Sequence, residues 1–227
     1  MQETVNEIVE DLKGLASKNH KKGFAHFKID DSSAFGVSMP LIRDLAKKIG
    51  KDTDLAMHLW DEGPHECKLL ASLVADPKTF TAQNADKWVS DFYSWDVCDQ
   101  AMINLFRKTD FIWDKIIEWF DWEGEFQRRA GFAGLAVLTV HHKKAEDQLF
   151  LNCFPFLEKY ASDERNFVKK SVNWANREIG KRRKNLYEPC IELCYRLVDQ
   201  DSASAKWIAS DALRELKSEK ILNRLNK

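Results

Sequence analysis

Apolar residues recur along this chain at intervals of three and four positions, which is the period of an α-helix. Clear examples run through residues 5–15, 41–49, 69–74, 116–120 and 186–197. No segment alternates strictly between apolar and polar residues beside Gly or Asn turns, which is the pattern of a strand. The sequence therefore predicts an all-α protein.

Short polar segments, some with Gly or Pro, interrupt this pattern and divide it into helices of roughly 10–17 residues. Only 9 Gly and 5 Pro occur among 227 residues, so the interruptions are few. They leave about twelve helices, which we expect to form about six pairs in one domain over residues 1–227. The interruptions are Gly63-Pro64, Asp76-Pro77, Ser94 to Asp96, Thr109-Asp110, Glu123-Gly124, Ala161 to Asp163 and Asp199 to Asp201.

A weak internal repeat supports the pairing. The segments RRAGFAGLAVL, KKSVNWANREI and AKWIASDALREL, which begin at Arg128, Lys169 and Ala205, can be superposed. In this superposition Ser171 comes 41 residues after Ala130, and Arg214 comes 37 residues after Arg177. A period near 40 with two helices per unit is typical of HEAT-like α-solenoids, in which each helix pair packs on the next. The sequence thus predicts an α-solenoid of HEAT-like helical repeats whose second helices line one concave groove.

Composition narrows the class of protein. With 44% hydrophobic and 31% charged residues, the chain is expected to fold and to be soluble. It has no apolar run long enough to span a bilayer, and its first residues show neither the basic n-region nor the apolar h-region of a secretory leader. We therefore expect a cytoplasmic protein without a membrane partner. Its five cysteines include no CxxC pair and no completed metal site, so we interpret them as small buried hydrophobic residues. We expect neither metal nor cofactor.

The formal net charge of −1 hides a division between the two halves of the chain. Residues 1–123 carry 15 Lys and Arg against 22 Asp and Glu, a net charge of −7, whereas residues 124–227 carry 20 against 14, a net charge of +6. Within residues 165–184 eight basic residues meet one acidic residue. A polyanion would therefore bind to the second half, although charged runs are often only solvated surface.

One helical segment, residues 167–183, places Trp174 among basic side chains, and an indole among cations suits a polyanion. Helical spacing puts Lys170, Trp174 and Arg177 on one stripe. The alternative is a core Trp on a helix whose solvated side is basic. The basic residues of this segment are Lys169, Lys170, Arg177, Lys181, Arg182 and Arg183, and Lys184 follows just beyond it.

Two further segments carry candidate chemistry. In SWDVCDQ, Asp96 is the candidate N-cap of the helix that follows, which would place Asp99 in the first helical turn. In the alternative interpretation, Trp95 is only a hydrophobic-staple residue and Asp99 is only half of a capping box. In GEFQRRAGFA we expect one of Arg128 and Arg129 to bind a helix end and the other to be free for a phosphate.

Together these segments resemble the DNA alkylation repair family, the AlkD-like HEAT-repeat DNA glycosylases, from about His20 to Leu216. The family's W-D-x-x-D, R-A and K-x-x-x-W-x-x-R-E motifs occur in order, and FAHFKIDDSSAFGVSMP resembles its first-repeat entry. Gly131 stands where the family more often has Ala, and Cys98 where it more often has an aliphatic residue. The motifs correspond here to Trp95 to Asp99, Arg129-Ala130 and Lys170 to Glu178.

The resemblance implies a monomeric glycosylase that acts on double-stranded DNA of the nucleoid without flipping the base. Purines alkylated at N3 or N7 are cationic and leave without a general acid, so the enzyme must stabilise the oxocarbenium-like sugar. The catalytic residues implied are Asp99 for this charge, Trp95 and Trp174 against the deoxyribose, and Arg129 on a phosphate. The DNA-binding candidates are Phe27, Lys169, Lys170, Arg177 and Lys181.

Two other functions fit the same features. The first is a non-catalytic binder of branched or distorted DNA, which would use the basic groove but would not need the Asp99 carboxylate. The second is a HEAT-like scaffold that binds an acidic protein partner. Duplex DNA would not compete with that partner for binding.

Overall fold

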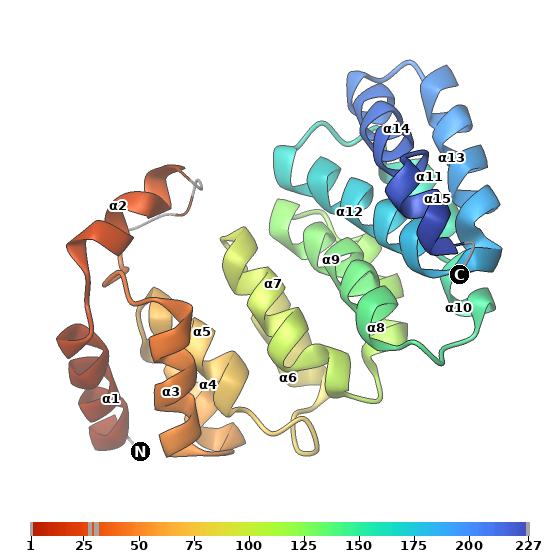
Figure 1. Ribbon diagram of the computed structural model, residues 1–227. Coiled ribbons are helices and arrows are strands. Elements are labelled where there is room, and N and C mark those ends of the chain that lie inside the picture. Colours follow the sequence, from red (N-terminus) through yellow and green to blue (C-terminus); the bar gives the residue numbers. More distant parts are fainter. Residues whose placement is uncertain (1, 27–28, 30–31, 226–227) are drawn as a thin grey trace. The chain divides into compact units, whose positions relative to one another are not determined.

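The computed structural model of the chain describes residues 2–26, 29 and 32–225 (Figure 1). Within these residues the regular elements are all helices, as the sequence predicts. The helices form two compact units, Met1–Asp110 and Phe111–Lys227. That the whole chain acts as one domain stays a prediction.

Among the residues that the structure describes, the first unit contains seven α-helices and a short 3-10 turn. The elements are α1 Gln2–Gly14, α2 Lys18–His26, α3 Met39–Ile49, α4 Thr53–Glu62, α5 His65–Val74, α6 Ala82–Ser90, α7 Trp95–Asn104 and the 3-10 turn η1 Phe106–Lys108. Side chains cap the starts of α4 and α6: the Asp52 carboxylate accepts a hydrogen bond from the Leu55 N–H at 2.8 Å, and the Thr81 hydroxyl accepts one from the Asn84 N–H at 3.2 Å.

Aromatic rings fill much of the core of the first unit. Trp60 of α4 stacks on Trp88 of α6 with ring centroids 4.1 Å apart, and Phe80, Phe92 and Phe106 surround this pair. All five are buried, so this packing joins α4, α6 and η1.

A buried carboxylate fixes the segment that leads into α3. Glu66 of α5 accepts hydrogen bonds from the backbone N–H groups of Phe35, Gly36 and Val37, the shortest at 2.7 Å from Gly36. Gly36 has a φ of 85°, which favours glycine. Because three donors converge on one buried acid, this segment is held against the start of α5.

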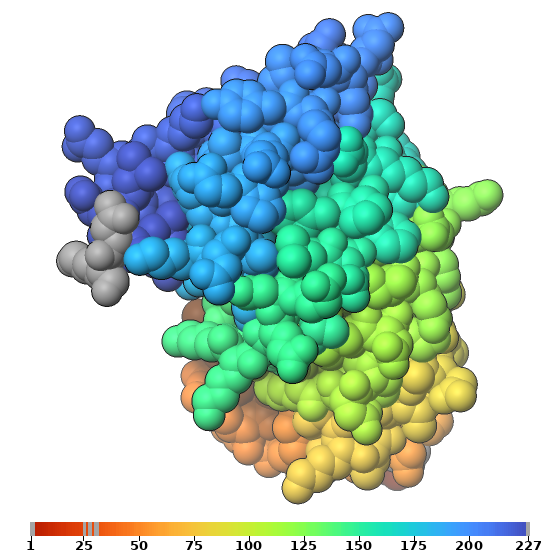
Figure 2. Space-filling model, turned by 90° about the vertical axis from the view of Figure 1, so that its right-hand side faces the viewer, coloured from red at the N-terminus to blue at the C-terminus, as the bar shows by residue number. Residues whose placement is uncertain are grey.

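The second unit, as far as residue 225, contains eight α-helices and one 3-10 turn. Figure 2 looks onto α13, in blue, beside the green-to-teal segment of α10 and α11. Its long helices α9, α12 and α14 lie side by side. The elements are α8 Ile112–Phe120, α9 Glu125–His141, α10 Asp147–Leu151, α11 Phe154–Tyr160, α12 Asn166–Arg182, the 3-10 turn η2 Lys184–Leu186, α13 Tyr187–Asp199, α14 Ala203–Leu216 and α15 Glu219–Leu225.

The repeat read from the sequence is present in this unit, since its three segments lie on α9, α12 and α14. Hydrogen bonds between neighbouring long helices repeat the same offset of 38 residues, from Arg129 to Phe167 and from Asn173 to Asp211. The predicted period near 40 is therefore confirmed, and equivalent positions of successive repeats touch.

The cysteines are buried as predicted, and all five are free thiols. Burial raises the pKa of Cys67 and Cys153 to about 12 and that of Cys194 to about 11, so these thiols stay protonated at neutral pH. None of the described helices combines the length and the apolar character that crossing a bilayer requires.

Candidate functional site

The W-D-x-x-D segment forms the start of α7, but its cap differs from the sequence prediction. Ser94 is the N-cap and the helix begins at Trp95, so Asp96 lies in the first turn and Asp99 in the second. The prediction that Asp96 caps the helix and puts Asp99 in the first turn is wrong, and so is the capping-box alternative. Trp95 and Asp99, four residues apart, share one side of α7.

A buried histidine explains where Asp96 points. The His65 Nε2 atom lies 2.8 Å from a carboxylate oxygen of Asp96, and its Nδ1 atom lies 2.8 Å from the Tyr93 hydroxyl. The Ser94 hydroxyl donates to the other Asp96 oxygen. Burial acts to raise the pKa of Asp96, but the hydrogen bonds from His65 and Ser94 outweigh it and hold that pKa below its ordinary value. Asp96 is therefore an ionised anchor for the start of α7.

Sequence reasoning missed His65. The only local sign is its position directly after Gly63-Pro64, at the first residue of a helix. Its partner Asp96 is 31 residues away, and nothing in the sequence pairs these two positions.

An apolar pocket of about 340 Å³ opens beside the start of α7, wholly within the first unit. Trp95 is half-buried in its wall and packs against the buried cluster of Phe24, Ile29 and Ala34. Asp96 and Gln100 supply polar groups from the same helix. The remaining lining residues come from α2, α3, α5 and the segment before α3, namely Asn19, His20, Gly23, Val37, Met39 and Leu69. Phe27, the aromatic DNA-binding candidate, lies outside the described residues.

Asp99 is buried, with 9% of its surface exposed, and like Trp95 it makes interactions within the chain. A carboxylate in such a position has fewer waters to screen it than one on an open surface, so its field acts more strongly on a charge brought close to it.

In the second unit both arginines of the R-R-A segment are engaged. The Arg128 Nε atom donates to the carbonyl of Phe120, the last residue of α8, and its guanidinium binds Asp163 at 2.8 Å. Arg129 has 6% of its surface exposed and donates to the Phe167 carbonyl in the first turn of α12 at 3.0 Å. Arg128 thus binds a helix end as predicted, but the prediction that the other arginine is free is wrong.

Trp174 lies in the middle of α12 and is half-buried, so it is not part of the closed core. Lys169 and Lys170 lie one turn earlier on this helix, and Lys170 is exposed. The Lys169 ammonium lies 5.1 Å from the ring centroid of Trp207 on α14, whose indole is 41% exposed. Trp207 belongs to the third repeat segment and was not a sequence candidate; its place one repeat after Lys169 was the available signal.

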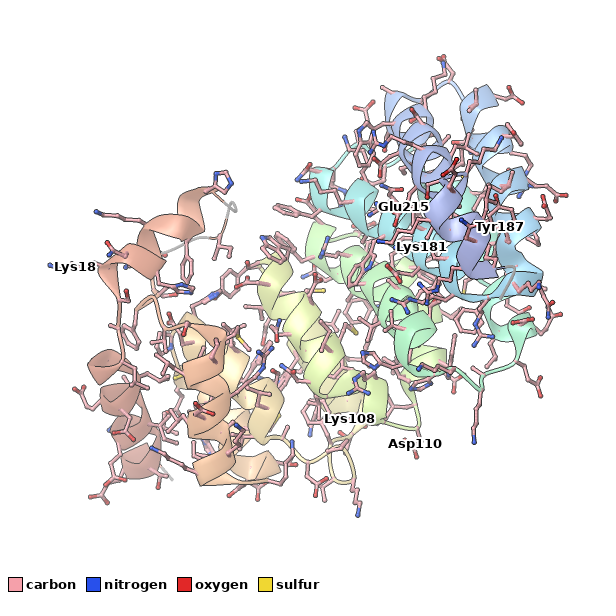
Figure 3. The ribbon with its side chains drawn as sticks, viewed as in Figure 1. Lys18, Lys108, Asp110, Lys181, Tyr187 and Glu215 are labelled. Atoms are coloured by element: carbon pink, nitrogen blue, oxygen red, sulfur yellow. The ribbon has the colours of Figure 1, made fainter. Side chains whose placement is uncertain are left out.

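The other two cationic candidates on α12 are bound to acids of the chain. Arg177 binds Glu215 at 2.8 Å and lies 3.5 Å from Asp211. Lys181 binds Glu178 at 2.8 Å and Glu215 at 2.9 Å (Figure 3 shows Lys181 and Glu215 together). Within the basic stretch counted in the sequence, acids of α12 itself and of α14 therefore bind Arg177, Lys181 and Arg182, and acids outside these two helices bind Arg165 and Arg183.

The structure places the four catalytic candidates in two pairs. Trp95 and Asp99 share α7 of the first unit, while Arg129 and Trp174 lie on the neighbouring helices α9 and α12 of the second. Each pair is described within its own unit, and the meeting of the two pairs stays a prediction.

Comparison with known proteins identifies the family. A family model described as "DNA alkylation repair enzyme" matches residues 8–218. The chain belongs to the DNA alkylation repair enzyme family. No curated protein sequence matches this member of the family.

A solved structure with 17% sequence identity matches this family member with a TM-score of 0.76, covering 93% of this chain and 94% of its own. It is described as a new family of proteins related to the HEAT-like repeat DNA glycosylases with affinity for branched DNA structures. This likeness shows the fold, so the predicted HEAT-like α-solenoid is confirmed. A designed armadillo repeat protein in complex with the peptide (KR)4 is 13% identical and the match covers 88% of this chain and 100% of the designed chain, but its TM-score of 0.41 is too low to show a shared fold.

Proposed function

We propose that this protein is a DNA glycosylase that removes cationic N3- or N7-alkylated purines from duplex DNA without flipping the base. The observation that carries the proposal is the start of α7, where Trp95 and the weakly exposed Asp99 share one side of a helix. Membership of the DNA alkylation repair enzyme family supports the choice of substrate.

The reaction needs little from the protein beyond electrostatics. As the bond between C1′ of the sugar and the purine breaks, its electron pair goes to the cationic base, which leaves neutral. Positive charge moves to the sugar ring, and the Asp99 carboxylate stabilises it. A water molecule then adds at C1′ and gives its proton to this carboxylate or to solvent, leaving an abasic site. Alkylated purines fit because they need no general acid.

The two half-buried indoles have supporting roles in this proposal. The ring faces of Trp95 and Trp174 would lie against the deoxyribose and stabilise it further as its charge grows. Lys169, Lys170 and the exposed Trp207 would bind the backbone beside the lesion.

Arg129 takes a different role from the one expected of it. Because its guanidinium is buried and bonded to the Phe167 carbonyl, we assign it to positioning the first turn of α12 and not to gripping a phosphate. It thereby sets the place of Lys169, Lys170 and Trp174 on that helix.

The test is incubation with a duplex that carries one 7-methylguanine, followed by alkaline cleavage at any abasic site. Strand cleavage at the lesion with the native chain, and none with undamaged duplex, is the expected result. A second candidate function, binding of branched DNA without catalysis, is favoured by the description of the structural relative. Tight binding of a DNA junction with no base release would select this candidate.

A further inference from the structure

A second basic region lies in the second unit, at the end of α12 away from Lys169 and Lys170. It is a pocket of about 390 Å³ formed where α9 and α12 end, closed by η2 and α15. Five cations and one acid line it: Lys143, Arg182, Arg183, Lys184, Arg224 and Asp147. The proposed glycosylase chemistry uses none of them.

Two of these cations bind groups of the chain itself and so have structural roles. Arg183 is buried, donates to the carbonyls of His142 and Ala145, and binds Asp147 at 2.7 Å, so it caps the end of α9. Arg182 donates to Glu178, one turn back on α12. Neither needs an external anion.

The other three cations are not accounted for by the fold. Lys143, Lys184 and Arg224 are exposed, and among the residues that the structure describes no acid forms an ion pair with them. The ends of α9 and α12 each contribute about −0.5 of a charge, roughly −1 together. These three cations outweigh this negative charge, so a charge of about +2 stays uncompensated in the pocket. Charge of this sign and density attracts an anion.

This basic pocket is separate from the basic start of α12. Arg182 comes twelve residues after Lys170, which is about 18 Å along a helix. The cations between them, Arg177 and Lys181, are paired with Glu215. A backbone that crossed directly from one region to the other would meet only cations that are already bound to a carboxylate, so the two regions are suited to two separate stretches of anion.

We propose that this pocket binds the sugar–phosphate backbone of a second duplex arm, so that the second unit holds two arms of a branched DNA at once. The inference rests on the proposed function in one respect, that the polyanion is DNA. The pocket has almost no apolar lining beyond Val140, and a protein partner would need an apolar anchor there. Backbone phosphates need only cations and hydrogen-bond donors, which the pocket supplies.

The test compares a four-way DNA junction with a linear duplex as long as two of its arms, over a range of salt concentrations. Lys143→Glu with Lys184→Glu should weaken junction binding about 10-fold or more and make its salt slope shallower by about 1.8, at roughly 0.9 per lost phosphate contact. Binding of the linear duplex should stay within about twofold of the native value, because its contacts lie at the start of α12.

Two control variants test whether the effect depends on charge at the pocket. Lys143→Arg with Lys184→Arg keeps the charge and should bind the junction like the native chain. Lys48→Glu with Lys78→Glu makes the same change of net charge on exposed positions of the first unit and should preserve the junction slope. If the Lys48→Glu, Lys78→Glu variant lowers junction affinity as much as the Lys143→Glu, Lys184→Glu variant does, the effect is one of net charge and the inference fails.

The remaining outcomes separate this inference from the proposed function. If the Lys143→Glu, Lys184→Glu variant binds the junction with the native affinity and salt slope, the second-arm inference alone is overturned. It is also overturned if this variant loses as much affinity for the linear duplex as for the junction. If the native chain binds no DNA of any form, the proposed function fails and this inference fails with it.

Discussion

Arg177 on α12 donates a hydrogen bond of 2.8 Å to the Glu215 carboxylate on α14, its partner one repeat later. The same carboxylate binds Lys181, and Glu178 binds Lys181 and Arg182. Two of the cations that the sequence assigns to DNA are thus engaged in joining repeats. From the sequence alone, five phosphate contacts and a slope of log affinity against log salt of roughly −4 to −5 are expected; the structure leaves fewer cations for this role.

The first prediction separates the two kinds of cation on α12. Lys170→Glu should weaken binding to damaged and undamaged duplexes alike and make the salt slope shallower by about 0.9, because exposed Lys170 is available to a phosphate. Lys181→Glu should leave that slope unchanged but lower the free energy of unfolding, because it sets three carboxylates against each other. Affinity titrations at several salt concentrations and urea unfolding measure the two effects. Equal slopes for both variants, each shallower than the native slope, would show that Lys181 also contacts DNA.

The second prediction concerns Asp99. Asp99→Asn should leave DNA affinity nearly unchanged and slow base release about 10²-fold or more, the typical effect of removing one preorganised electrostatic stabiliser. Single-turnover excision of 7-methylguanine measures it. Asp96→Asn is the contrasting variant: it should lower stability, because it weakens the anchor at His65. Native excision by the Asp99 variant would remove this carboxylate from the mechanism.

The third prediction concerns the half-buried indoles. Trp174→Ala and Trp95→Ala should reduce excision more than stability, because part of each ring lies outside the core. Trp119→Ala is the matched control in the second unit, since that indole is fully buried. Its loss should cost about 3–5 kcal/mol of unfolding free energy, as is usual for truncation of a core aromatic residue. An equal loss of stability in Trp174→Ala would place Trp174 in the core instead.

The fourth prediction explains a departure from the family pattern. A Cβ at Gly131 of α9 would lie 2.9 Å from the Ile116 carbonyl oxygen and 3.0 Å from the Phe120 nitrogen, both backbone atoms of α8. Gly131→Ala should therefore lower the unfolding free energy, by about 1–3 kcal/mol, the usual cost of overpacking. Gly23→Ala, at an open helical position, should be neutral or stabilising by roughly 0.5–1 kcal/mol. A Gly131→Ala protein as stable as the native one would show that α8 and α9 can move apart.

The fifth prediction concerns acid stability. Burial acts to raise the pKa of Asp163, but hydrogen bonds from Arg165 and Arg128 outweigh it and hold this pKa below its ordinary value. The carboxylate thus contributes stability that is fully present above its unfolded pKa of about 3.9 and is lost as pH falls through its lower folded pKa. Asp163→Asn should be less stable at pH 7 and should lose less stability between pH 5 and pH 2. Thermal unfolding across this range measures it; parallel native and variant curves would contradict it.

The sequence by itself determined the class and period of the fold. Helical spacing of apolar residues and the polar interruptions are local properties, so the breaks at Gly63-Pro64 and Glu123-Gly124 coincide with helix ends in the structure. The repeat segments are also readable from the chain, because equivalent helices must present similar small and apolar residues to their neighbours. The burial of the cysteines followed from their chemistry and context.

The tertiary structure alone decided which polar groups are available. Asp96 is an anchor because His65 reaches it across 31 residues, and Arg177 is neutralised by an acid 38 residues away. An ion pair depends on a distance of a few ångströms between residues far apart in sequence, and a charge count over one segment cannot contain it. The same reason hid the basic pocket, whose free cations come from three segments that the sequence keeps apart and the packing of α9, α12 and α15 brings together.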